Sequence, residues 1–354
     1  MRILAFFWLF VATGHCHPAL VAVDRRDLRW RTDVTAADKL PTVTRDRRLA
    51  VLGAPVESGA SRRGCVMGPA SLRTAEIVER LQRLGYAVDD HGDVVPTPVA
   101  GLELPGNARG APEIAGWARS LAARTYELLR DGTTPIVLGG DHSLAMGSVV
   151  GVARHCAEAG RELFVLWLDA HADFNTPATS PSGNMHGMPV ACFCGEDGFD
   201  GLFGDDFQAR VSPSNVAMVG VRSIDEDERT LLRKRGVEVV DMRAIDEWGV
   251  AAPMREFLRR VKARDGLIHV SLDVDFLDPG VAPGAGTAVP GGATYREAHL
   301  IMELLYDSGR VASADIVELN PFLDERGRSA VVLAEMTASL FGQTILARPA
   351  RPVS

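Results

Sequence analysis

Several features that define large protein classes are missing from this 354-residue chain. It has five cysteines, an odd number, so the sequence gives no disulfide framework, and the Cys-x-Cys of Cys192 and Cys194 lacks the second pair of a zinc site. Basic residues are not in excess, and a net charge of −8 gives no electrostatic reason to bind nucleic acid. No proline- or serine-rich linker and no internal repeat divides the sequence. Buried thiols in a reducing compartment and one folded unit are the simplest interpretation.

What the chain does have is enough apolar residues for a large core, arranged as alternating strand and helix patterns. Hydrophobic residues make up 46% of it, and 35 residues are glycine. Apolar strand patterns alternate with helical patterns along the chain, for example 47–53 then 68–84, 216–221 then 225–235, and 311–318 then 327–345. This alternation predicts a single α/β domain in three layers, with a mainly parallel central sheet and helices on both faces.

Residues with metal-binding chemistry follow three of the predicted strands, 135–138, 163–168 and 267–272. The runs at the ends of these strands are Gly-Gly-Asp-His-Ser at 139–143, Asp-Ala-His-Ala-Asp at 169–173 and Ser-Leu-Asp-Val-Asp at 271–275. In a parallel sheet, ligands bind outside the carboxyl ends of the strands, because the loops of neighbouring strands converge there. The sequence therefore predicts that two histidines and four aspartates meet at one edge of the sheet.

The spacing within these runs favours a pair of divalent metal ions. Residues two apart in an extended segment point to the same side, so Asp169, His171 and Asp173 can face one cavity. Asp273 and Asp275 can do the same. Four carboxylates brought this close would repel one another unless cations neutralised them. Four oxygen donors with two imidazoles favour manganese over zinc, copper or magnesium.

Two of the three runs also have a simpler interpretation. Asp141 and His142 precede an apolar helix and could serve only to cap it. A lone Asp-x-Asp in a loop is more often turn chemistry than a ligand pair. Asp-x-His-x-Asp directly after a six-residue apolar strand has no comparable alternative, so a dinuclear metal site is the prediction.

Longer motifs surround these runs, between about Arg47 and about Ala347. They are Gly53–Pro55, Gly64–Pro69, Gly183–Val190, Gly286–Glu297 and Val317–Pro321. Together with the three runs they resemble the segments of the ureohydrolase family, which contains the arginases, the agmatinases and their relatives. The closer likeness is to arginases of the shorter bacterial type. The resemblance implies the arginase-like α/β fold and a hydrolase that acts on linear amidines.

The resemblance also implies the metal ligands and the cofactor. The ligands of one ion match His142, Asp169, Asp173 and Asp273, and those of the second match Asp169, His171, Asp273 and Asp275. Asp169 and Asp273 would bridge the two ions. The implied cofactor is two Mn²⁺ per subunit, and the implied nucleophile is a hydroxide that bridges them and attacks the guanidinium carbon of the substrate.

Three residues match catalytic groups of the family. Asp173 matches the ligand that accepts the hydroxide proton and passes it to the leaving nitrogen, and His186 matches a histidine of proton transfer. Glu318, at the tip of an apolar strand, matches the carboxylate that pairs with the guanidinium. Without the resemblance, His186 would be a surface-loop histidine and Glu318 the partner of an internal arginine.

Loop residues match the contacts by which arginases recognise the rest of the substrate. Residues matched to the α-carboxylate are Asn175, Ser180 and Ser182; Asp225 matches the α-amino contact, and Thr287 belongs to the predicted substrate site. Ser223 stands where some arginases have a second aspartate. The implied reaction converts L-arginine to L-ornithine and urea, and an agmatinase or another guanidino-acid ureohydrolase is the alternative. The family further implies a homotrimer or homohexamer, with no nucleic-acid or membrane partner.

The amino-terminal part differs from the rest. Residues 3–11 form a nine-residue apolar run behind Arg2, long enough for the core of a signal peptide and too short to span a bilayer. Residues 24–48 are polar and lack periodicity, which favours disorder. We therefore expect an extension over residues 1–45 and a ureohydrolase domain over 46–350. A cytoplasmic location is the expectation, and export through a signal peptide at residues 1–14, or a misplaced gene start, would explain the extension differently.

Two other functions are compatible with the same pattern. A catalytically silent family member could bind metal or arginine, although the full ligand set with His186 and Glu318 argues against this. A hydrolase such as a deacetylase could use the same scaffold with one zinc ion, although four aspartates disfavour zinc. Urea release and metal stoichiometry distinguish these possibilities.

Overall fold

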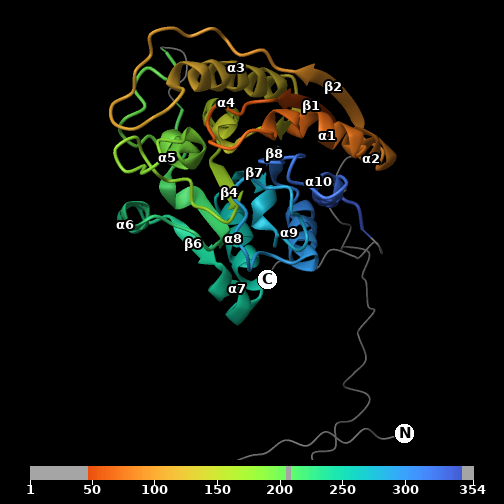
Figure 1. Cartoon of the computed structure of the whole chain (residues 1–354). Coiled ribbons are helices and arrows are strands. Elements are labelled where there is room, and N and C mark those ends of the chain that lie inside the picture. Colours follow the sequence, from red (N-terminus) through yellow and green to blue (C-terminus); the bar gives the residue numbers. More distant parts are fainter. Residues whose placement is uncertain (1–46, 205–208, 345–354) are drawn as a thin grey trace, which may run out of the picture. The chain divides into compact units, whose positions relative to one another are not determined.

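A parallel sheet of eight strands runs through residues 47–204 and 209–344, the part of the chain that the computed structural model describes (Figure 1). The strand order is β2-β1-β3-β8-β7-β4-β5-β6, and every pairing is parallel. The strands are β1 (Arg48–Ala54), β2 (Ala87–Asp93), β3 (Thr133–Gly139), β4 (Leu163–Leu168), β5 (Val216–Val221), β6 (Glu238–Asp241), β7 (Leu267–Asp273) and β8 (Val311–Val317). The predicted parallel sheet is confirmed.

Helices cover both faces of this sheet, as predicted. Alternate side chains of β1 enter different clusters: Ala50 and Leu52 pack with the helices of one face, and Leu49 and Val51 with those of the other. The first face carries α3 (Ala111–Arg130), α4 (Ala145–Glu158), α5 (Pro189–Cys194) and α6 (Glu226–Arg235). The second carries α1 (Gly68–Thr74), α2 (Ile77–Arg83), α7 (Met242–Trp248), α8 (Ala251–Ala263), α9 (Tyr295–Ser308) and α10 (Arg328–Leu340). Burial of both faces explains why the central strands are continuous apolar runs.

Some predicted element bounds need correction. The single helix predicted over 68–84 is wrong, because Glu76 has φ 63°, in the left-handed region, and separates α1 from α2. The helix predicted over 327–345 is α10, which ends at Leu340. Predictions for residues 1–45 and 345–350 fall outside the described residues. Within the described ranges, none of the helices is both long enough and apolar enough to cross a membrane.

The strand order brings the predicted ligand runs together. β3 and β4 follow one another in the chain, but β8 and β7 lie between them in the sheet. The carboxyl ends of these four central strands are therefore neighbours, and each one leads directly into residues of the predicted site. This is the position in an open α/β sheet at which ligands bind.

Candidate active site

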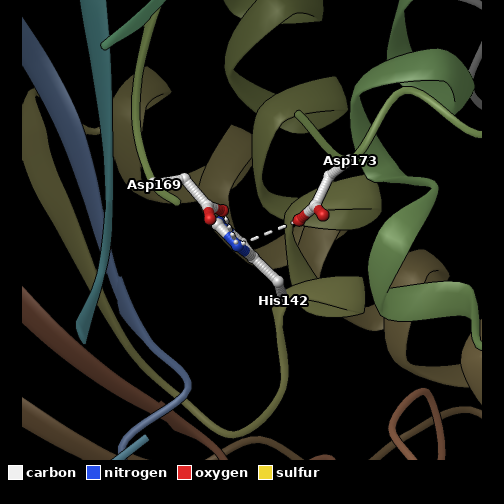
Figure 2. Close-up of side chains that lie close together, drawn as sticks. All are labelled: His142, Asp169 and Asp173. Atoms are coloured by element: carbon white, nitrogen blue, oxygen red, sulfur yellow. Dashed lines mark ion pairs between the residues drawn. The ribbon is translucent and has the colours of Figure 1, made fainter. Parts of the chain in front are cut away.

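Each of the three ligand runs folds into a tight turn that its own first aspartate closes. The aspartate accepts the backbone N–H of the residue two positions later, at 2.7 to 3.0 Å, and the pairs are Asp141 with Ser143, Asp169 with His171, and Asp273 with Asp275. Asp141 thus caps the short 3-10 helix η3 (His142–Leu144), which is the simpler role considered for it. The side chain of His142 nevertheless points toward the aspartates of the second run (Figure 2).

His142 is the centre of the first group of predicted ligands. Its Nδ1 lies 3.0 Å from Oδ2 of Asp169, 3.2 Å from Oδ2 of Asp173 and 3.1 Å from Oδ2 of Asp273. Figure 2 shows the first two of these carboxylates converging on the imidazole from different directions. All four residues are buried, with exposed fractions of 8% or less.

His171 is the centre of the second group. Its Nδ1 lies 3.2 Å from Oδ2 of Asp275 and 3.4 Å from Oδ1 of Asp169. Asp169 therefore faces both histidines, one with each carboxylate oxygen. Thr287, predicted to contact substrate, donates instead to Oδ2 of Asp275 at 3.0 Å. The structure thus brings the six predicted ligands into two groups that share Asp169.

Burial and mutual repulsion of the carboxylates dominate the electrostatics of these groups. Burial lowers the pKa of His142, but the surrounding carboxylates outweigh it and raise that pKa well above its usual value. Burial, followed by the negative charge of Asp169, raises the pKa of Asp173 to about 6. Burial, followed by the charges of Asp275 and Asp169, raises the pKa of Asp273 well above its usual value. Protons or cations must therefore neutralise the cluster, and a metal ion does so by using the same lone pairs.

Unsatisfied atoms and outer contacts fit a metal ligand set. Nδ1 of His142 and Oδ2 of Asp169 are buried, face one another and have no well-aligned hydrogen bond. Nε2 of His142, on the opposite side of the ring, lies 2.8 Å from Oγ of Ser271, and Trp167 stacks on the ring at 3.9 Å between centroids. A ligating histidine usually has such a partner on its second nitrogen, which fixes the tautomer and the ring orientation.

His186, which is partly buried, and Glu318, which is buried, form an ion pair beside the metal groups. Nδ1 of His186 lies 2.8 Å from Oε1 of Glu318, and the same oxygen accepts the backbone N–H of His142 at 2.8 Å. The partner of Glu318 is therefore a histidine and not the arginine considered above. Burial lowers the pKa of His186, but the negative charge of Glu318 outweighs it and raises that pKa to about 9. Burial opposes ionisation of Glu318, whereas His186 favours it, and the net effect lowers the pKa of Glu318.

Two residues of the site hold a backbone conformation that non-glycine residues rarely adopt. Asp173 has φ 51° and Glu318 has φ 62°. Such conformations cost about 1–3 kcal/mol each and persist where surrounding contacts hold them. The N–H of Glu318 donates to the carbonyl of Gly140 at 2.8 Å, and the carbonyl of Asp173 accepts the N–H of Val190 at 3.0 Å. The backbone at these two positions is therefore held by neighbouring loops.

A cavity of about 240 Å³ opens onto these groups. The cavity is lined by carboxylates and imidazoles, those of Asp169, His171, Asp173, Asp273, His186 and Glu318, and by the polar loop residues Asn175, Ser180, Ser182, Ser223, Asp225 and Thr287. The amide of Asn175 donates to Oδ2 of Asp225 at 3.0 Å, so two of the predicted substrate residues are in direct contact. A cavity lined by carboxylates, imidazoles and small polar groups fits a small charged molecule.

Glu228, which is not among the predicted site residues, also lines this cavity. Its carboxylate accepts the backbone N–H of Phe174 at 2.7 Å and that of Asp225 at 3.3 Å. Burial raises the pKa of Glu228 to about 7. The available signal was the spacing Asp225-x-x-Glu228 before a helix, the pattern of a capping box. That pattern points Glu228 back at the helix start and so toward the cavity.

Comparison with known proteins agrees with this geometry. The sequence profile described as the Arginase family matches residues 47–342. The chain belongs to the arginase family. It is 53% identical over 299 residues to an arginase of Agrobacterium fabrum, a match covering 84% of this chain and 92% of that protein. An arginase of Brucella melitensis is also 53% identical, over 84% of this chain and 97% of its own length.

Solved arginase structures share the fold. The native structure of the Bacillus caldovelox arginase at pH 5.6 superposes with a TM-score of 0.78 and is 40% identical, covering 85% of this chain and all of that one. The resemblance to bacterial arginases found in the sequence is thus confirmed. The arginase-family match includes every residue of the candidate site, from Asp141 to Glu318.

Proposed function

We propose that this protein is an arginase that hydrolyses L-arginine to L-ornithine and urea, with two Mn²⁺ ions as cofactor. One observation carries the proposal. Two groups of candidate metal ligands that share Asp169 border a cavity, and polar loop residues line the same cavity. Membership of the arginase family, with a relative called arginase at 53% identity, supports the same reaction.

The donor set is the reason for proposing manganese. His142, Asp169, Asp173 and Asp273 would hold one ion, and Asp169, His171, Asp273 and Asp275 the second. Carboxylate oxygens with one imidazole for each ion suit a harder cation than zinc or copper, and the imidazoles favour Mn²⁺ over Mg²⁺. When bound, the pair of cations supplies the nucleophile, because it lowers the pKa of water toward neutrality.

Residues of the chain would position the substrate and move the protons. Glu318 keeps its negative charge at neutral pH and is placed to pair with the cationic guanidinium of arginine. Asp173, which lies in the same cavity, would accept a proton and release it to the leaving nitrogen. His186, held protonated by Glu318, can donate a proton in this cavity.

The polar loop residues of the cavity would select arginine over analogues that lack its α-carboxylate. Asn175, Ser180 and Ser182 offer hydrogen-bond donors for the carboxylate. Asp225 offers a negative charge for the α-amino group. Because Asn175 donates to Asp225, each holds the other in place before substrate arrives. A site built in this way rejects an analogue that leaves its polar groups unpaired.

Urea release tests the proposal. Manganese-loaded protein should release urea from L-arginine in large excess over agmatine or guanidinobutyrate. A chelator should abolish the activity, and Mn²⁺ should restore it better than Zn²⁺ or Mg²⁺. Comparable turnover of agmatine would make the enzyme another ureohydrolase, and a metal stoichiometry near one per subunit would contradict the dinuclear site.

We further propose a homotrimer or homohexamer, a cytoplasmic location, and a catalytic domain over residues 46–350, all from the likeness to bacterial arginases. Light scattering on the purified protein measures the assembly. Mass spectrometry of the native amino terminus distinguishes a processed, exported protein from an unprocessed one.

A further inference from the structure

The proposed guanidinium partner, Glu318, has one neighbour that no part of the proposed function uses. This neighbour is Cys65, which lies in the short 3-10 helix η2 (Cys65–Met67) after β1 and is 1% exposed. Its Sγ lies 3.5 Å from Oε2 of Glu318. The carbonyl oxygen of Glu318 is farther, at 3.8 Å, so the single S–H hydrogen has the carboxylate as its nearer acceptor.

The hydrogen bonds of Glu318 divide unequally between its two carboxylate oxygens. Oε1 faces the backbone N–H of His142 and the imidazole of His186, both at 2.8 Å. Oε2 faces only the thiol of Cys65 among the described residues. A carboxylate has about four acceptor positions, two on each oxygen. With Oε1 occupied twice and Oε2 once, the remaining acceptor position is on Oε2.

We propose that Cys65 is a positioning residue for guanidinium binding: its thiol donates to Oε2 of Glu318 and orients the one acceptor position left for the substrate. This inference rests on the proposed function, since it concerns the same site. In this proposal Cys65 orients the carboxylate of Glu318 and does not contact the substrate.

The chemistry of a thiol suits this role better than that of a stronger donor. A lysine or arginine here would neutralise Glu318 and repel the cationic substrate. The thiol is neutral and a weak donor, so it restricts rotation of the carboxylate while leaving its charge for the guanidinium. Burial, and then the charge of Glu318, raises the pKa of the Cys65 thiol, so the group stays protonated and remains a donor.

The segment before Cys65 is held by backbone hydrogen bonds at two positions, Gly59 and Arg63. The N–H of Gly59 donates to Oδ2 of Asp141 at 2.8 Å, and its carbonyl accepts the N–H of His186 at 3.1 Å. The amide of Asn320 donates to the carbonyl of Arg63 at 2.9 Å. Cys65 is thus held against the end of β8 by contacts other than its own, and replacing its side chain removes the S–H···O bond without releasing the segment.

Three variants of Cys65 and one control test the proposal. Cys65→Val and Cys65→Ala remove the donor with different volumes, and Cys65→Ser keeps a donor. Cys156→Val is the matched control, because Cys156 is also 1% exposed but lies in α4, away from Glu318. The probes are guanidine hydrochloride and L-ornithine, which lacks a guanidinium. Their Kd values for manganese-loaded protein are measured by calorimetry, which needs no turnover.

Cys65→Val and Cys65→Ala should each raise the Kd of guanidinium roughly 3- to 10-fold, the range for one hydrogen bond, and leave that of L-ornithine within about twofold. The KM for L-arginine should rise by the same factor as the guanidinium Kd. Cys65→Ser should stay near the parent, and Cys156→Val should change neither ligand. An unchanged guanidinium Kd in both donor-free variants, or equal weakening of both ligands, overturns the proposal. If the Kd values change as expected but the parent protein releases no urea from arginine, the proposed function is refuted and the role of Cys65 in guanidinium binding is not.

Discussion

Replacing Ser271 with alanine should weaken metal binding by more than the change in stability explains. Oγ of Ser271 lies 2.8 Å from Nε2 of His142, and both residues are buried. When Nδ1 binds a metal ion, the hydrogen of the neutral imidazole is on Nε2 and the serine oxygen accepts it. By accepting this hydrogen, the hydroxyl stabilises the ring orientation that leaves the Nδ1 lone pair toward Asp169, Asp173 and Asp273.

The contact between Ser271 and His142 sets the expected size of two losses, one in metal affinity and one in the free energy of unfolding. Loss of the partner on the second nitrogen of a ligating histidine lowers metal affinity about 10- to 100-fold. This equals about 1.4 to 2.7 kcal/mol of binding free energy. The free energy of unfolding should also fall, by about 1–3 kcal/mol, because Nε2 of His142 is left without a partner in the core.

Ser313 provides a matched control on the neighbouring strand. Its Oγ lies 2.8 Å from Nδ1 of His269, again in the core, but His269 is not a predicted ligand. Ser313→Ala should lower the free energy of unfolding by a similar amount and leave the Mn²⁺ affinity unchanged. Mn²⁺ affinity is measured by calorimetry and unfolding by urea denaturation of the chelator-treated protein. Equal losses of Mn²⁺ affinity in the two variants, or a Ser271→Ala affinity within twofold of the parent, would refute the reasoning.

Three further predictions concern the substrate, the ion pair and the extension. Asp225→Ala should raise the KM for L-arginine and reduce the preference over agmatine, which the parent should show at up to roughly 10⁴-fold, and an unchanged ratio of kcat/KM would remove Asp225 from the substrate site. The His186–Glu318 pair raises the pKa of His186 to about 9, so its stabilisation is complete below about pH 6.5 and is lost as pH rises through 9. The gap in unfolding free energy between the parent and His186→Gln should therefore narrow from pH 6 to pH 10 in urea denaturation, and a constant gap would contradict the ion pair. Removing residues 1–45 should leave a folded enzyme with the urea release of the full chain, and an insoluble or inactive product would mean that the segment packs on the domain.

The central strands could be predicted from the sequence because burial on both faces makes them continuous apolar runs. The strand predicted at 163–168 is β4 to the residue, and those at 135–138 and 267–272 lie within β3 and β7. The break at Glu76 could not be predicted, because no glycine or proline marks it. β2, with the polar sequence AVDDHGD, is an edge strand of the described sheet, where its one partner is β1, and it lacks the apolar signal.

For the site, too, residues close together in the sequence could be predicted, whereas contacts between distant residues could not. The spacing of two residues predicts Asp169, His171 and Asp173 as ligands, because residues at this spacing lie on one side of an extended segment. The same alternation extends from Asp273 back to Ser271, and so could have indicated Ser271 as well. Cys65 could not be found, because its contact with Glu318 joins residues far apart in the chain and depends on how β1 and β8 flank β3.

The strand order has a consequence for how the protein reaches its native state. Ile136 of β3 pairs with Ala314 of β8, so the central part of the sheet joins positions separated by about half of the chain. Parallel pairing over such distances is slow, because the closure entropy is lost before the contacts form. The two ligand groups exist only once β3, β8, β7 and β4 have paired. Metal ions therefore add their binding energy to the native state alone, and they should slow unfolding without accelerating refolding.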